Sequence, residues 1–277
     1  TPLTSSAASD VYKRQGIGSH SFVKYSTKAY QYGFSSTMTY MNDWFFMPLF
    51  MFGWLPIVYY TKVRSIPEYF EKRFNKTARY LATTMTLLYM IGYIAIQLLT
   101  LATALYRIYN IPLMMTVIII AIATTIYMHF GGQTSVIFTD LFQGLILLFA
   151  GLLLFFLGLQ YLGYGQFSNG LSSFWSYLSP GQKLPLAHFN HPPNFNFVGI
   201  FWQDGIAGSI GFLFLNQGLI MRFMAARSVN EGRKAAAFNV LLILPISAIV
   251  VSNAGWIGRA IANGMPGVLP ADLQPVS

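Results

Sequence analysis

Long apolar stretches recur along the chain, separated by shorter polar segments, and each is long enough for an α-helix to cross about 30 Å of hydrocarbon. A further stretch, residues 17–34, is rich in Gly and Ser and carries Lys24 and Lys28, so we expect it in a membrane only where it lines a cavity or is covered by protein. The pattern predicts an all-α, multi-span membrane helical bundle of about seven spans. The six clearer apolar stretches are residues 44–60, 81–105, 111–130, 136–163, 197–221 and 235–258.

The polar connections suggest an orientation. Residues 61–80 and 222–234 are rich in Lys and Arg, and basic loops favour the cytoplasmic side of a membrane. Alternation of the predicted spans puts both segments on one side, so we expect both to be cytoplasmic. The longest connection, residues 164–196, contains several Pro and aromatic residues. It predicts an external loop with a short interfacial helix around residues 171–178.

Composition agrees with this interpretation and narrows the function. Hydrophobic residues make up 55% of the chain and charged residues only 9%, well below the charged share of about 25% in soluble domains. The net charge of +9 comes from basic residues that gather between apolar stretches, so we expect no nucleic-acid partner. There is no Cys, which excludes disulfides and thiolate chemistry. His188 and His191 lack further ligands nearby in the sequence, so a metal site there is not expected.

Known catalytic motifs are missing from the sequence. It contains no nucleophile elbow, no phosphate-binding glycine loop and no HExxH motif, so we expect that the protein is not an enzyme. Both ends of the chain are unusual. Residues 1–15 are polar and patternless, and we interpret them as a non-native or disordered N-terminal end. We expect residues 16–263 to form a partial transmembrane core and residues 264–277 to be a truncated external loop.

Several segments are similar to those of a known family. SIPEYFEKRFN (65–75), GGQTSVIFTDLFQGLILLFAG (131–151) and NQGLIMRFMAARSVNEGRKA (216–235) resemble three signature segments of the sodium/solute symporter family, in the same order. GSHSFVKYSTKAYQYG (18–33) resembles the first core helix of that family more loosely, and the similarity extends from Gly16 to Asn263. The first of these strings also predicts a short cytoplasmic surface helix, with Ser65 as its cap, Pro67 in its first turn and Glu68 near its positive end.

The resemblance implies a partial leucine-transporter-type fold, in which the first helix of each inverted repeat is broken near the membrane midplane. The breaks would fall at Gly16–Ser21 and Gly205–Gly211, although close helix packing also explains such small residues. For Na⁺, the resemblance implies a backbone carbonyl of Ile17 and an exit route past Asp140. Asp140 could instead cap the fifth span. The remaining Na⁺ ligands would come from a Ser-bearing eighth span that this chain lacks, so we expect that these 277 residues alone neither bind Na⁺ tightly nor transport.

The resemblance also implies a substrate site. The sugar-transporting branch has Gln, Glu, Asn and Lys where this sequence has Ser21, Tyr40, Ser209 and Ile243, so a sugar is not expected. Lys24 and Lys28 lie on one helical face, and each could bind an anionic substrate such as a carboxylate, substitute for a cation or extend to the external interface. Tyr93 and Gln97 could line the cavity or bond to another helix. The candidate substrate-binding residues are Gly18, Ser19, Ser21, Lys24, Tyr93, Gln97 and Ser209.

The resemblance thus predicts a secondary active transporter that couples the entry of Na⁺ to symport of a small organic solute by alternating access. The alternative is a transporter-like sensor module of a membrane signalling protein, since such modules also occur fused to signalling domains. An ion channel is disfavoured because nothing resembles a selectivity filter. We expect Na⁺, a small solute and the lipid bilayer as partners, no organic cofactor, and a bacterial inner membrane as the location. The sequence does not decide the oligomeric state or the solute.

Overall fold

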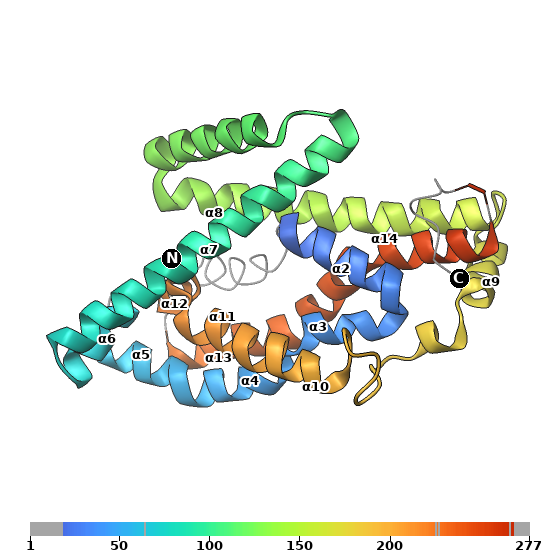
Figure 1. Ribbon diagram of the computed structural model, residues 1–277. Coiled ribbons are helices and arrows are strands. Elements are labelled where there is room, and N and C mark those ends of the chain that lie inside the picture. The colour runs from blue at the N-terminus through green and yellow to red at the C-terminus, as the bar shows by residue number, and fades with distance from the viewer. Residues whose placement is uncertain (1–18, 64, 225, 227, 266, 269–277) are drawn as a thin grey trace. The chain divides into compact units, whose positions relative to one another are not determined.

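The computed structural model describes residues 19–63, 65–224, 226, 228–265 and 267–268. All regular structure within these residues is helical, which confirms the predicted all-α class (Figure 1). The helices are α2 Ser19–Tyr32, η1 Gly33–Thr37, α3 Met38–Met41, α4 Asp43–Leu49, η2 Phe50–Trp54, α5 Leu55–Thr61, α6 Ile66–Arg73, α7 Lys76–Tyr109, α8 Leu113–Leu162, α9 Phe167–Tyr177, η3 Pro180–Lys183, α10 Phe197–Ile200, η4 Phe201–Ser209, α11 Ile210–Leu215, α12 Gln217–Met224, α13 Val229–Phe238, η5 Asn239–Ile243 and α14 Leu244–Gly264.

Six stretches of the described residues are long and apolar enough to cross a membrane. They expose many large apolar side chains, for example Phe130 at 85% and Tyr80 at 71%, as expected for surfaces that face lipid rather than water. The six stretches are Ser21–Thr61, Lys76–Tyr109, Leu113–Gly131, Phe142–Leu162, Phe197–Leu215 and Val229–Gly264. The prediction of a multi-span helical membrane protein is therefore confirmed.

The first of these stretches covers two of the predicted spans. Ser21–Thr61 is 41 residues long, about twice the roughly 20 residues that one crossing requires. Gly33, near the end of the first predicted span, has a φ of +71° in the region that favours glycine, and α2 gives way there to the 3-10 helix η1. A Cβ atom at position 33 would also overlap the backbone of Gln182. The prediction of seven separate spans thus becomes six continuous candidate stretches, of which the first is long enough for two crossings.

The fourth and fifth predicted spans join in a different way. The structure has one helix, α8, of 50 residues, although only two parts of it, Leu113–Gly131 and Phe142–Leu162, qualify as candidate spans. The backbone at position 140 lies inside this helix, so Asp140 does not occupy a helix start, and the alternative that it caps the fifth span is wrong. The side chain of Asp140 lies outside the part of the molecule that the structure describes.

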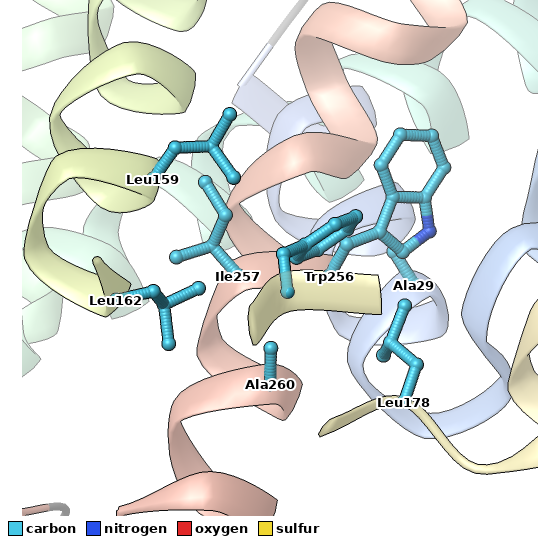
Figure 2. Packing of buried hydrophobic residues seen from close by; sticks show 8 residues of the cluster. Ala29, Leu159, Leu162, Leu178, Trp256, Ile257 and Ala260 are labelled. Carbon is cyan, nitrogen blue, oxygen red and sulfur yellow. The ribbon is translucent and has the colours of Figure 1, made fainter. Parts of the chain in front are cut away.

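The chain divides into two compact units. Of the described residues, the first unit contains those within 19–20, 43–143 and 207–241, and the second contains those within 21–42, 144–206 and 242–268. In the first unit, Phe50 of η2 packs in an apolar cluster with Leu213 of α11 and Phe223 of α12. Side chains of α2, α8 and α14 form the main cluster of the second unit, and Figure 2 shows Leu159 and Leu162 of α8 facing Ile257 of α14.

The two basic segments meet at one end of the first unit. Ser65 caps α6 as predicted, because its hydroxyl accepts a hydrogen bond from the backbone N–H of Glu68 at 3.3 Å. The backbone N–H of Ile66 donates to Gln217 Oε1 of α12 at 2.9 Å, and Ile220 of α12 packs against Tyr69 of α6. Since α12 leads into the second basic segment, these contacts bring the starts of the two segments together, as expected if both face the same side of a membrane.

Candidate substrate and ion sites

Lys24 of α2 forms an ion pair with Asp204 of η4 in the second unit. Lys24 Nζ lies 2.9 Å from Asp204 Oδ1, and the two side chains are 30% and 19% exposed. Both residues belong to candidate membrane spans. A lone charge is costly at such a position, whereas a paired one is much less so. The sequence identified Lys24 as a candidate but not its partner, which is 180 residues further along the chain.

The neighbours of Lys24 on α2 form a polar and aromatic face. Ser21, Lys24 and Tyr25 follow the spacing of one helical face, and Ser21 is partly exposed. Lys24 Nζ lies 5.5 Å from the centre of the Tyr25 ring. That ring makes an edge-to-face contact with Tyr40, at 4.7 Å between centroids. The face therefore offers a cation, a hydroxyl and an aromatic wall within the second unit.

Lys28 lies one helical turn further along α2 and has different neighbours. Its Nζ is 5.2 Å from the centre of the Tyr32 ring and 5.4 Å from that of Phe195, and those two rings stack at 4.0 Å. These are cation–π distances. The structure therefore gives Lys24 an acidic partner and Lys28 an aromatic environment.

Ser209 belongs to the first unit, where it bonds to Asp43 at the start of α4. The Ser209 hydroxyl donates to Asp43 Oδ1 at 2.6 Å, and Ser209 is only 2% exposed. Tyr93 and Gln97 of α7 belong to the same unit. Tyr93 is 38% exposed and stacks on Tyr89 at 6.1 Å, and Gln97 is partly exposed. The candidate substrate residues thus fall into two groups, Ser21 and Lys24 in the second unit, and these three in the first.

For three candidate residues in the N-terminal segment the structure gives no side-chain geometry. Ile17 and Gly18 are outside the described residues, as is the first half of the predicted break at Gly16–Ser21, whereas its second half, residues 19–21, lies in α2. Ser19 begins α2, but its side chain is not described. Within the described residues, no group of three or more His, Asp or Glu residues could hold a metal ion.

The second predicted break, at Gly205–Gly211, is wrong in its position and kind. Residues 201–209 form η4, a π-helix, so the backbone stays helical through most of this glycine-rich stretch. The helix ends instead at Leu215, because Asn216 has an extended backbone (φ −77°, ψ 103°) before α12 begins. Wider π turns often occur at functional sites, and both Asp204 and Ser209 lie in this one.

The sequence did contain a signal for Asp204 and Asp43. The chain has only 8 acidic residues, and an acid inside an apolar span is a functional candidate. Asp204 lies in FWQDGIAG, within the predicted span 197–221, and Asp43 lies just before the span 44–60. A hydropathy average over a whole span hides a single charged residue. The partners, Lys24 for Asp204 and Ser209 for Asp43, are too far away in the sequence to be found from residue spacing.

The chain matches a known protein family. The model of the sodium:solute symporter family matches residues 4–274. The chain belongs to this family. The sodium/glucose cotransporter of Vibrio parahaemolyticus is 29% identical over 205 residues, which are 71% of this chain and 37% of that protein. Sodium-coupled monocarboxylate transporter 2 of Bos taurus is 26% identical over 215 residues, which are 76% of this chain and 34% of that protein.

A third relative is the sodium/sialic acid symporter SiaT of Proteus mirabilis, 26% identical over 254 residues, which are 84% of this chain and 48% of the relative. The chain therefore spans between about a third and half of the length of these relatives. A solved structure of a substrate-bound, outward-open Na⁺-coupled sialic acid symporter matches with a TM-score of 0.79 at 22% identity, covering 97% of this chain and 55% of that one. This match confirms the fold, and the family membership confirms an integral membrane protein of a transporter family.

Proposed function

We propose that the protein carries out sodium-coupled symport of a small organic solute by alternating access. Family membership carries this proposal, since the match covers residues 4–274. The relatives named above are a cotransporter, a transporter and a symporter, and the name of each includes sodium. No observation favours the alternative of a sensor module.

The assignment of residues to this activity is part of the proposal. Na⁺ would bind through the carbonyl of Ile17 and leave past Asp140, and Ser21, Lys24 and Ser209 would contact the solute together with Gly18, Ser19, Tyr93 and Gln97. The ion pair of Lys24 supports an ionic role for that residue. Residues 16–263 would form the core, and a bacterial inner membrane would be the location, where an inward Na⁺ gradient drives entry.

Uptake measurements test the proposal. Cells expressing the complete gene are given radiolabelled carboxylates, amino acids and sugars in buffers that contain either Na⁺ or choline. We expect at least one solute to enter at least about tenfold faster in Na⁺, because the inward movement of the ion supplies the driving force. Cells with an empty vector are the control. Equal entry of every accumulated solute in the two buffers would contradict the coupling.

A further inference from the structure

In the ion pair between Lys24 and Asp204 of the second unit, the positive and negative charges cancel. Each partner lies in a candidate membrane span, where removal of one would leave an uncompensated charge. An anion that takes the place of Asp204 at Lys24 displaces a carboxylate that already lies 2.9 Å from Lys24 Nζ. The competitor that fits best is another carboxylate, because it offers the same acceptor geometry to an ammonium group.

The surroundings of the pair allow such competition. Neither side chain is sealed from the outside, at 30% and 19% exposure. Ser21, one turn before Lys24, is also partly exposed, and its hydroxyl could donate to a second carboxylate oxygen. Tyr25 and Tyr40 form an aromatic wall beside Lys24 that suits a small apolar group. A compact monocarboxylate would match these three features.

We propose that Lys24 and Asp204 form an exchangeable carboxylate site, in which a small monocarboxylate solute replaces Asp204 at Lys24 and a Na⁺ ion compensates the released Asp204. This inference rests on the proposed function and names its class of solute. The charges balance, because the solute anion and the cation enter together and the site remains neutral. The exchange would make binding of the anion depend on the cation, a reciprocal coupling between two ligands.

Equilibrium binding tests this exchange without requiring transport. The purified complete gene product is heated with acetate, lactate or nicotinate, and with the matching amides acetamide, lactamide and nicotinamide, in Na⁺ or choline buffer. For the natural protein we expect at least one carboxylate to raise the unfolding temperature more than its amide does, and to do so in Na⁺ only. The affinity follows from how the unfolding temperature rises with carboxylate concentration. We expect it to be at least about tenfold higher in Na⁺ than in choline, because one hydrogen bond to a charged group contributes about that much binding free energy.

Three variants separate the exchange from a structural role. Asp204→Asn removes the internal competitor, so the carboxylate should bind at least about tenfold more tightly in choline and no longer need Na⁺. Lys24→Gln should abolish the preference for carboxylate over amide. Lys24→Gln/Asp204→Asn, which carries no unpaired charge, should fold normally and also lack that preference. Lys28→Gln is the matched control, because the recorded neighbours of Lys28 are aromatic rings, and it should change the affinity less than about twofold.

Two results would overturn the exchange. One is equal stabilisation by every carboxylate and its amide in the natural protein. The other is that Asp204→Asn and Lys24→Gln both lose carboxylate binding and the double variant regains it. That result would mean that the ion pair only holds the structure together. Sodium-independent uptake by cells would instead refute the proposed function, while leaving the binding result to be judged separately.

Discussion

Replacing Gly255 by alanine is expected to destabilise the second unit by about 3 kcal/mol, in the range of overpacked cores. A Cβ atom at position 255 of α14 would overlap the carbonyl oxygen of Ser26, and it would lie 2.7 Å from both Ala29 Cβ and the Tyr30 backbone nitrogen of α2. Two of these three atoms belong to backbone, which cannot move aside as the end of a flexible side chain can. The two helices would have to separate.

Separation would also break other interactions between these elements. The Ser26 hydroxyl donates to the carbonyl of Val251 at 2.7 Å, and Trp256 Nε1 donates to the carbonyl of Gly33 at 2.9 Å. Trp256 also lies in the buried cluster that Figure 2 shows. Thermal unfolding and the monodisperse yield in detergent measure the effect of the substitution.

Gly258→Ala provides the matched control for this prediction. It is the same substitution on the same helix, but the added Cβ would lie 3.5 Å from the Tyr30 ring, an ordinary van der Waals contact. We expect it to change stability by less than about 1 kcal/mol, the propensity difference between the two residues. Equal unfolding temperatures for the two variants would show that α2 and α14 do not approach as closely as described.

The second large effect is expected at Asp43 and Ser209 in the first unit. Ser209→Ala removes a hydroxyl that is 2% exposed and that donates to Asp43 at 2.6 Å. Leaving a buried hydrogen-bond partner unsatisfied costs about 1–3 kcal/mol, and we expect a loss of at least about 1.5 kcal/mol, because Asp43 loses a donor inside a candidate span.

A double-mutant cycle measures this interaction. Ser209→Ala, Asp43→Asn and the combined variant are unfolded thermally, and we expect a coupling energy of at least about 1.5 kcal/mol. Thr116→Val is the control, since the hydroxyl of Thr116 is also buried but donates to the carbonyl of Pro112 in the preceding turn of its own chain segment, at 3.1 Å. Additive effects of the two single substitutions would contradict a direct bond.

The sequence predicts well what depends on local pattern. Apolar length identifies the spans because unpaired backbone groups are not tolerated in hydrocarbon. The cap of α6 by Ser65 follows from the order of residues in SIPEYFEKRFN, and the structure confirms it. Counting spans predicts a common membrane side for the two basic segments, and that stays a prediction, while the contacts of Ile66 and Tyr69 with α12 show that the segments begin close together.

What the sequence does not predict depends on partners that are distant along the chain. Lys24 has no acid within reach on its own helix, so its pairing with Asp204 could not be read from spacing. The π-helix η4 and the end of the helix before Asn216 could not be predicted from local sequence either. Glycine density at Gly205–Gly211 predicts local flexibility, but a helix turn widens or ends where tertiary packing determines it.

The coupling of Na⁺ to the solute is tested most directly by reversing it. The complete gene product is reconstituted in liposomes, and an inward gradient of the solute found by uptake is imposed with equal radiolabelled Na⁺ on both sides. Because coupling between the two ligands acts in both directions, we predict that Na⁺ accumulates inside against its own rising gradient, and that it does not when the solute gradient is absent. Entry of the solute with no accompanying accumulation of Na⁺ would contradict sodium-coupled symport.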